Sequence, residues 1–279
     1  MGLVINTNVP ALNTARILRR STLALNKSLE RLASGLRINS AKDDAAGLAI
    51  AESFRSQVLG LRVAARNSQD GISLVQTAEG ALSEVTNILQ RIRELAVQAA
   101  NGTNTVQNRA DLDLEVQQLK LQITDIARRT TFNGVLILNG TVPGNKIILQ
   151  TGVKATETTD IDFTNANVLL TGPLALSTTG VDGADATKAN AAIVAVDLAL
   201  IIVNSQRATF GAAQNRLEFT IKVLEIQAEN NAAAESAIRD VDIAQETIIF
   251  TRNQILVSAG TSILAQANLV PQTALQLLG

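Results

Sequence analysis

The chain has 279 residues, with 24 lysines and arginines, 25 aspartates and glutamates, and neither histidine nor cysteine. Without cysteine there are no disulfides or thiolate zinc sites, and without histidine the commonest metal ligand and general base are missing. The net charge of −1 gives no electrostatic footprint for nucleic acid or anionic lipid. We therefore expect a structural protein that is not an enzyme, needs no cofactor and binds no nucleic acid.

Both ends of the chain are almost free of charge. No side chain from residue 1 to 15, or from 253 to 279, is ionisable. These ends are rich in leucine, isoleucine, valine and alanine, yet they contain too much asparagine, glutamine and threonine to predict membrane insertion. They also lack the pattern of a cleaved secretory signal. We expect them to bury against protein, most simply against other copies of the same chain.

The first predicted helix runs from about residue 11 to 36. Its apolar or small residues alternate in steps of four and three, which is typical of a helix that packs along another helix. Gly35 and residues 37–40 weaken the helix, and the Ser40 to Asp43 spacing predicts a capping box and a second helix from near Lys42. The predicted self-assembly seam on this helix consists of Leu18, Leu25, Leu29 and Leu32.

The second predicted helix extends to about Ala100 and contains Gly60, Gly71 and Gly80, which we interpret as sites of close helix approach rather than breaks. A turn at 101–104 separates it from a third helix, which ends near residue 132. Residues 135–188 have no helical period and contain short β-branched runs, which predicts a small β-hairpin insert.

Helical spacing returns between residues 193 and 228 and again after about residue 240. We predict a mainly α fold: a long antiparallel helical bundle or coiled coil, built from both chain ends, with the small hairpin insert in the middle. The middle is the only place where the chain can turn back. The predicted self-assembly seam on the last helix is one heptad column, Ile249, Leu256, Ile263 and Val270.

Five segments of the chain resemble bacterial flagellin, the subunit of the flagellar filament. They are residues 28–47, 65–72 with 76–82, 89–104, 211–217 and 259–271, within a resemblance that covers about 1–165 and 190–279. The resemblance implies an inner terminal coiled-coil domain of residues 1–40 and 240–279. It also implies a helical bundle domain of residues 41–239, which includes the insert at about 135–188.

The resemblance further implies a function and its partners. The chain would self-assemble into a homopolymeric filament for motility, after secretion through the flagellar export apparatus to the extracellular flagellum. Its expected partners are the flagellar cap and hook-associated proteins, and an export chaperone at the C-terminal segment. The alternative is a hook–filament junction protein, against which the dense match over residues 28–104 argues.

One stretch also resembles the epitope that vertebrate Toll-like receptor 5 recognises in many flagellins. The matching residues are Gln90, Arg91, Leu95 and Glu115, although these side chains could instead pack against neighbouring subunits. A second polar cluster, Arg31, Arg37 and residues 42–44, is either a capped hinge or a site of ion pairs between subunits. The Asp-x-Asp pairs at 111/113, 160/162 and 240/242 lack the glycine and distal glutamate of a calcium loop, so we interpret them as solvated helix ends and hairpin edges.

Overall fold

The computed structural model describes residues 7–170, 172–184 and 186–276, and from residue 270 onward it describes the backbone alone. The chain divides into two compact units. The first unit consists of Met1–Gln57 with Glu229–Gly279, and the second of Val58–Ala228. This division lies inside two long helices, whereas the domain division expected from the sequence, at 40/41 and 239/240, coincides with the linkers between helices. The functional domain boundaries therefore stay a prediction.

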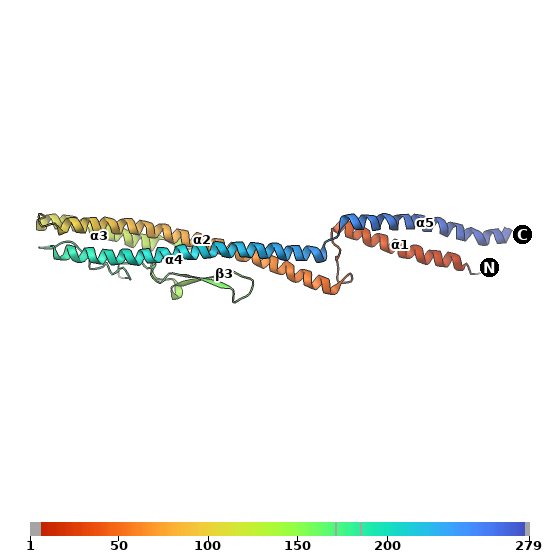
Figure 1. The fold of residues 1–279 in the computed structure, drawn as a ribbon, viewed down its shortest axis with the longest axis horizontal. Helices are drawn as coiled ribbons and strands as arrows, with labels where there is room; N and C mark the ends of the chain where they lie inside the picture. Colours follow the sequence, from red (N-terminus) through yellow and green to blue (C-terminus); the bar gives the residue numbers. More distant parts are fainter. Residues whose placement is uncertain (1–6, 171, 185, 277–279) are drawn as a thin grey trace. The chain divides into compact units, whose positions relative to one another are not determined.

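The described residues form five α-helices, as expected for a mainly α chain. They are α1 (Val9–Ser34), α2 (Ala45–Ala100), α3 (Val106–Arg129), α4 (Thr187–Arg239) and α5 (Ile243–Gln276). In the first unit α1 and α5 lie side by side and antiparallel, and in the second unit α3 lies along α2 and α4 (Figure 1). The predicted helical bundle built from both chain ends is confirmed.

The ends of α1 and α2 follow from local hydrogen bonds. The side chain of Asn8 accepts from the amide of Ala11, and Gly35, at φ +72°, ends α1 by donating to the carbonyl of Arg31. The predicted capping box does not start α2, because Ser40 and Asp43 bond to each other in the preceding turn. Asp44 accepts from the amide of Gly47 instead, so α2 begins at Ala45 rather than near Lys42.

The core of the second unit lies between the inner faces of α2, α3 and α4. Its largest fully buried side chains include Leu82, Leu89, Ile123, Phe210 and Leu217. By length and composition α4 alone, among the described residues, could cross a membrane. Its buried positions recur at helical spacing and pack into this core. The protein interior therefore accounts for that face of α4.

The predicted β insert is small. Strands β1 (Thr131–Phe132) and β2 (Val135–Leu136) pair antiparallel, as do β3 (Lys146–Gln150) and β4 (Thr158–Asp162), with Lys146 opposite Asp162. A short 3-10 turn, Pro143–Asn145, precedes β3. After β4 the described residues up to 184 form turns and loops, and Phe163 packs on Phe210 with ring centroids 5.0 Å apart.

Two buried cations on α3 hold this irregular segment. Arg109 donates to the carbonyls of Ala99 and Asn101 at the end of α2 and to that of Ala184. Lys120 donates to the carbonyls of Ser177 and Thr179, at 3.3 and 2.7 Å, and burial lowers the pKa of its amine. The helical period did not reveal either residue, because each carries a charge at a position that faces the interior.

The three glycines of α2 that the sequence analysis singled out, Gly60, Gly71 and Gly80, have different surroundings. A Cβ on Gly71 would lie 2.2 Å from Leu149 Cδ1 and 3.2 Å from Leu217 Cδ1, and one on Gly60 would lie 3.2 Å from Val153. Nothing lies within 4 Å of a Cβ on Gly80. Close approach of another helix is confirmed at Gly71, where Leu217 of α4 is one of the neighbours. It is wrong at Gly60, whose nearest neighbour is Val153 in the β3–β4 hairpin, and at Gly80. None of the three glycines breaks α2, as predicted.

This contrast predicts stability changes of opposite sign. Gly71→Ala should destabilise the second unit by about 1 kcal/mol, because overpacking outweighs the gain in helix propensity. Gly80→Ala, in open space, should stabilise it by up to about 1 kcal/mol. Urea denaturation of both variants measures the difference, and two shifts of equal sign would contradict the packing at Gly71.

Candidate functional site

The terminal helix pair, α1 with α5, is the candidate assembly site. Three contacts set its antiparallel register: Asn8 Nδ2 donates to Ala267 O at 2.7 Å, Leu18 lies against Gly260, and Arg31 pairs with Glu246. A Cβ on Gly260 would lie 3.1 Å from Leu18 Cδ1, so a glycine at this point lets the two helices approach closely.

The inner face of this pair, where α1 and α5 meet, combines large side chains with small or polar ones. Heptad steps from Leu18 and Gly260 bring Leu25 level with Asn253 and Leu32 level with Glu246. Between these levels α1 has small side chains and α5 has large ones. By the same spacing, Thr14 lies level with Leu264, Ser21 with Val257 and Ser28 with Phe250. This complementarity in size favours one register of the pair.

The predicted seam residues divide between two sides of the helices. Leu18, Leu25, Leu32 and Ile249 are half-buried within the first unit. Leu29, Leu256 and Ile263 are 55%, 48% and 53% exposed. On α5 the half-buried column is Phe250, Val257 and Leu264, which leaves Leu256 and Ile263 outside the inner face. The side chain of Val270 lies outside the described residues. The part that these residues play in self-assembly stays a prediction.

The outer face of α5, on the side away from α1, is apolar as well. It consists of Ile248, Ile255, Leu256, Ile263 and Leu269, all largely exposed. From Asn253 onward α5 has no charged side chain, so apolar residues cover two opposite faces of one helix. A helix of this kind is normally buried on both sides, and a second surface must therefore cover the outer face.

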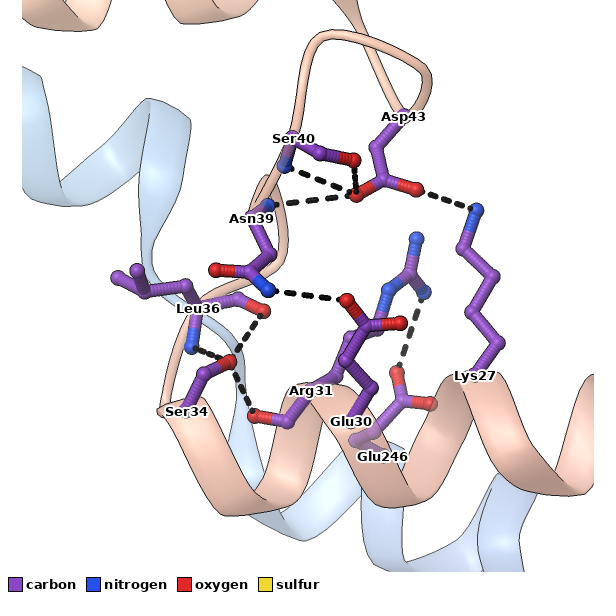
Figure 2. A network of polar contacts seen from close by, with 9 residues as sticks. All are labelled: Lys27, Glu30, Arg31, Ser34, Leu36, Asn39, Ser40, Asp43 and Glu246. Atoms are coloured by element: carbon purple, nitrogen blue, oxygen red, sulfur yellow. Dashed lines mark hydrogen bonds and ion pairs between the residues drawn. The ribbon is translucent and has the colours of Figure 1, made fainter.

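The first linker, residues 35–44, is tied to α1 by an acidic side chain (Figure 2). Asp43 Oδ1 lies 3.0 Å from Lys27 Nζ, and Oδ2 accepts from the amides of Asn39 and Ser40 and from the Ser40 hydroxyl. The Lys27 ammonium is the main cause that lowers the pKa of Asp43 from its ordinary 3.8 to about 2. The linker is therefore held by an ionised carboxylate.

The second linker, residues 240–242, is bound to the first. The amides of Arg37 and Ile38 donate to Arg239 O, Val241 N donates to Gly35 O, and the Arg37 guanidinium caps the carbonyl end of α4 at Ala237 and Ile238. Of the polar cluster predicted from the sequence, Arg31 pairs with Glu246 at 3.4 Å and Asp44 caps α2. Lys42 is exposed. These contacts lie within the chain, and the alternative of ion pairs between subunits stays a prediction.

The Asp43 contacts predict an acid-sensitive linker. A carboxylate whose folded pKa is lowered stabilises the fold above its ordinary pKa of 3.8, and this contribution is lost as the pH falls toward about 2. A titration of Asp43 by NMR should therefore have its midpoint near pH 2. In Lys27→Met the midpoint should rise toward 3.8, whereas Lys42→Met, which alters an exposed side chain, should leave it near 2. A midpoint near 3.8 in the unaltered protein would contradict the contact.

The epitope-like residues lie in the second unit, on α2 and α3. Arg91 donates from Nε and Nη2 to Glu115 Oε1, at 3.0 and 2.9 Å, and from Nη1 to Glu94, and these carboxylates, Glu115 first, raise the pKa of Arg91. Gln90 is exposed as well. Leu95 is only 1% exposed and belongs to the core, so the structure places it beneath the surface rather than on it. Glu94 belongs to this patch, although the resemblance did not single it out.

Comparison with known proteins identifies the chain. Residues 5–142 match the bacterial flagellin N-terminal helical region, and residues 193–278 match the bacterial flagellin C-terminal helical region. The chain belongs to the bacterial flagellin family. A flagellin from Halalkalibacterium halodurans is 49% identical over 276 residues, covering 99% of this chain and 100% of the relative. The flagellin of Bacillus subtilis is 47% identical, covering 98% of this chain and 99% of the relative.

Two further similarities concern a filament protein and a solved structure. A flagellar filament 31.3 kDa core protein from Treponema maltophilum is 42% identical over 286 residues and covers 99% of this chain and all of the relative. The crystal structure of Bacillus cereus flagellin is 38% identical, with a TM-score of 0.49, over 61% of this chain and 94% of that one. Flagellins are structural filament proteins, so this member of the family is not an enzyme.

Proposed function

We propose that this chain is the structural subunit that self-assembles through its terminal helices into a bacterial flagellar filament for motility. The observation that carries the proposal is α5, which is apolar on two opposite faces and uncharged from Asn253 onward. Within one chain α1 covers only the inner face. Neighbouring copies of the same chain supply the surface for the outer face.

The free energy of burial explains why assembly and ordering of the terminal helices belong together. Ordering one residue costs about 1–2 kcal/mol, and an isolated helix does not recover this cost. In α1 from Val9 to Lys27 and in α5 beyond Glu246 no described side chain is fully buried. Contacts between copies would bury the outer faces at about 25 cal/mol per Å² of apolar area. The filament, rather than the monomer, is then the state in which the pair is stable.

The same exposed surface supports the finer proposals about partners. A chain whose C-terminal segment is apolar on two faces needs protection before assembly, which an export chaperone at that segment would provide. Secretion through the flagellar export apparatus, and contacts with the cap and the hook-associated proteins, complete the proposal. A putative flagellar hook-associated protein from Vibrio parahaemolyticus, with a TM-score of 0.57, is only 17% identical, which shows a shared fold alone. It does not favour the hook–filament junction alternative.

Seeded assembly tests the function directly. Purified chain added to short filament seeds should form filaments visible by electron microscopy, whereas a chain truncated before Asn253 should not. The core cluster consists entirely of residues of the second unit, so that unit should keep its helical signal in the truncated chain. Filaments formed by the truncated chain would contradict an assembly mechanism through α5.

The receptor interaction is a separate proposal for the monomer. The exposed patch of Gln90, Arg91 and Glu115 offers a guanidinium fork and carboxylates on a rigid pair of helices, and Leu95 supports it from the core. We propose that Toll-like receptor 5 recognises this patch when the protein is present in a vertebrate host. In the filament, neighbouring subunits would cover the same patch.

Arg91→Ala tests the receptor proposal. The variant should reduce activation of receptor-bearing reporter cells about tenfold or more, because it removes a charge-assisted contact that is central to the patch. Arg93→Ala is the matched control, since Arg93 pairs with Asp197 on α4 and not with Glu115. Unchanged signalling by a folded Arg91→Ala monomer would remove the receptor role from this patch.

A further inference from the structure

The outer face of α1, turned away from α5, carries a band of arginines without acidic partners. Arg16, Arg19 and Arg20 are exposed and alternate with the exposed apolar residues Val9, Leu12 and Leu23. Arg16 donates to Asn13 Oδ1 at 2.9 Å, and within the described residues none of the three arginines makes an ion pair. If the apolar part of this face is buried during assembly, three guanidinium groups are buried with it and need partners.

The terminal helices themselves cannot supply these partners. The described part of α5 has one carboxylate, Glu246, which pairs with Arg31, and α1 has one, Glu30, which accepts from Asn39. All other residues of the two helices are neutral or cationic. The carboxylates must therefore come from another part of a neighbouring copy.

The second linker carries two carboxylates that no cation binds in the described part of the chain. Asp240 and Asp242 are exposed. Asp242 Oδ1 accepts from the amides at the start of α5, which leaves Oδ2 available, and the backbone of Asp240 pairs with Leu36. Two arginines bonded to or adjacent to this linker are engaged elsewhere, Arg239 with Glu52 at 2.8 Å and Arg37 with the carbonyl end of α4.

We propose that the arginine band of one copy binds Asp240 and Asp242 of a second copy that is displaced along the helix axis. This inference rests on the proposed self-assembly and adds a specific contact to it. Because Leu18 lies level with Gly260, the displacement corresponds to α5 from Ile243 to Gly260, about 26 Å at 1.5 Å per residue. A contact between two different surfaces of identical copies forms a ring or an open chain, and the displacement along the axis makes this one an open chain, so its repetition produces a filament.

The chemistry of the two surfaces suits this contact. Guanidinium groups bind carboxylates through two parallel hydrogen bonds, which fix a geometry as well as adding attraction. Burial of the neighbouring Val9, Leu12 and Leu23 would exclude water from the pairs. The ion pairs would set the axial position of each copy, and apolar burial would supply most of the affinity.

Charge reversal tests the proposal in seeded sedimentation assays. The double variant Arg19→Glu/Arg20→Glu should raise the critical concentration at least tenfold, and so should Asp240→Arg, which leaves the cap at Asp242 intact. Tenfold corresponds to about 1.4 kcal/mol. The triple variant, which combines these three substitutions, should return to within about threefold of the unaltered chain. Arg128→Glu, an exposed arginine on α3, is the control and should change nothing.

The outcomes separate this inference from the function on which it rests. Unaltered chain that fails to extend seeds would contradict the proposed function, and the inference with it. Double-variant chain that assembles as well as the unaltered chain would overturn the inference while the function stands. The same holds if both reversals impair assembly but the triple variant does not recover, because the two surfaces would then not bind each other. Equal helicity of all monomers by circular dichroism excludes misfolding as the cause.

Discussion

Ile263→Asp is expected to abolish filament formation and to leave the monomer's thermal unfolding unchanged. Ile263 lies on the outer face of α5 and is half exposed, so a carboxylate at this position remains hydrated in the monomer. In the filament each subunit would bury an unpaired charge, at a cost of several kcal/mol. This cost equals or exceeds the free energy that burial of one apolar side chain contributes to assembly. No cation on α5 lies close enough in sequence to offset that cost, since the charged side chain nearest to position 263 in the described part of the helix is Arg252.

Thr178→Asp is the matched control, because Thr178 is exposed in a loop of the second unit. It should assemble like the unaltered chain. Sedimentation after seeding, together with motility of cells that carry each variant, measures the difference. Normal filaments from Ile263→Asp would show that the outer face of α5 is not an assembly surface, and equal damage by Thr178→Asp would place the loop region in the assembly core.

Arg109→Ala is expected to destabilise the second unit by about 3 kcal/mol or more. The substitution leaves three buried or partly buried carbonyls without their charged donor, at Ala99, Asn101 and Ala184. It also releases the end of α2 from the loop before α4. For a unit of this size the loss corresponds to a fall in melting temperature of about 10 °C.

Two further variants check the cause of that loss. Arg128→Ala, on the exposed side of the same helix, should change the stability by no more than about 0.5 kcal/mol. Arg109→Lys should recover only part of the loss, because an ammonium cannot reproduce the planar fork that reaches three acceptors. A melting temperature of Arg109→Ala equal to that of the unaltered protein would contradict the role of this arginine.

The positions of the helices and the family follow from the order of the residues alone. Three-and-four spacing is imposed by the helix on every amphipathic segment, so α1 to α5 could be predicted to within a few residues at most ends. The long matching segments within residues 28–104 and 259–271 are enough to indicate flagellin. The absence of charge from Asn253 onward indicates a surface that is buried against other copies of the chain.

Tertiary structure decided which side of each helix faces which partner. The last helix has apolar columns on both sides, so spacing alone could not choose between Leu256 and Val257 for contact with α1, and the size of the opposing residue made the choice. Gly71 and Gly80 look alike in the sequence, but only Gly71 meets the hairpin. Asp43 meets Lys27 only because the folded linker returns to α1. Arg109 binds backbone carbonyls, which carry no sequence signal because every residue has one.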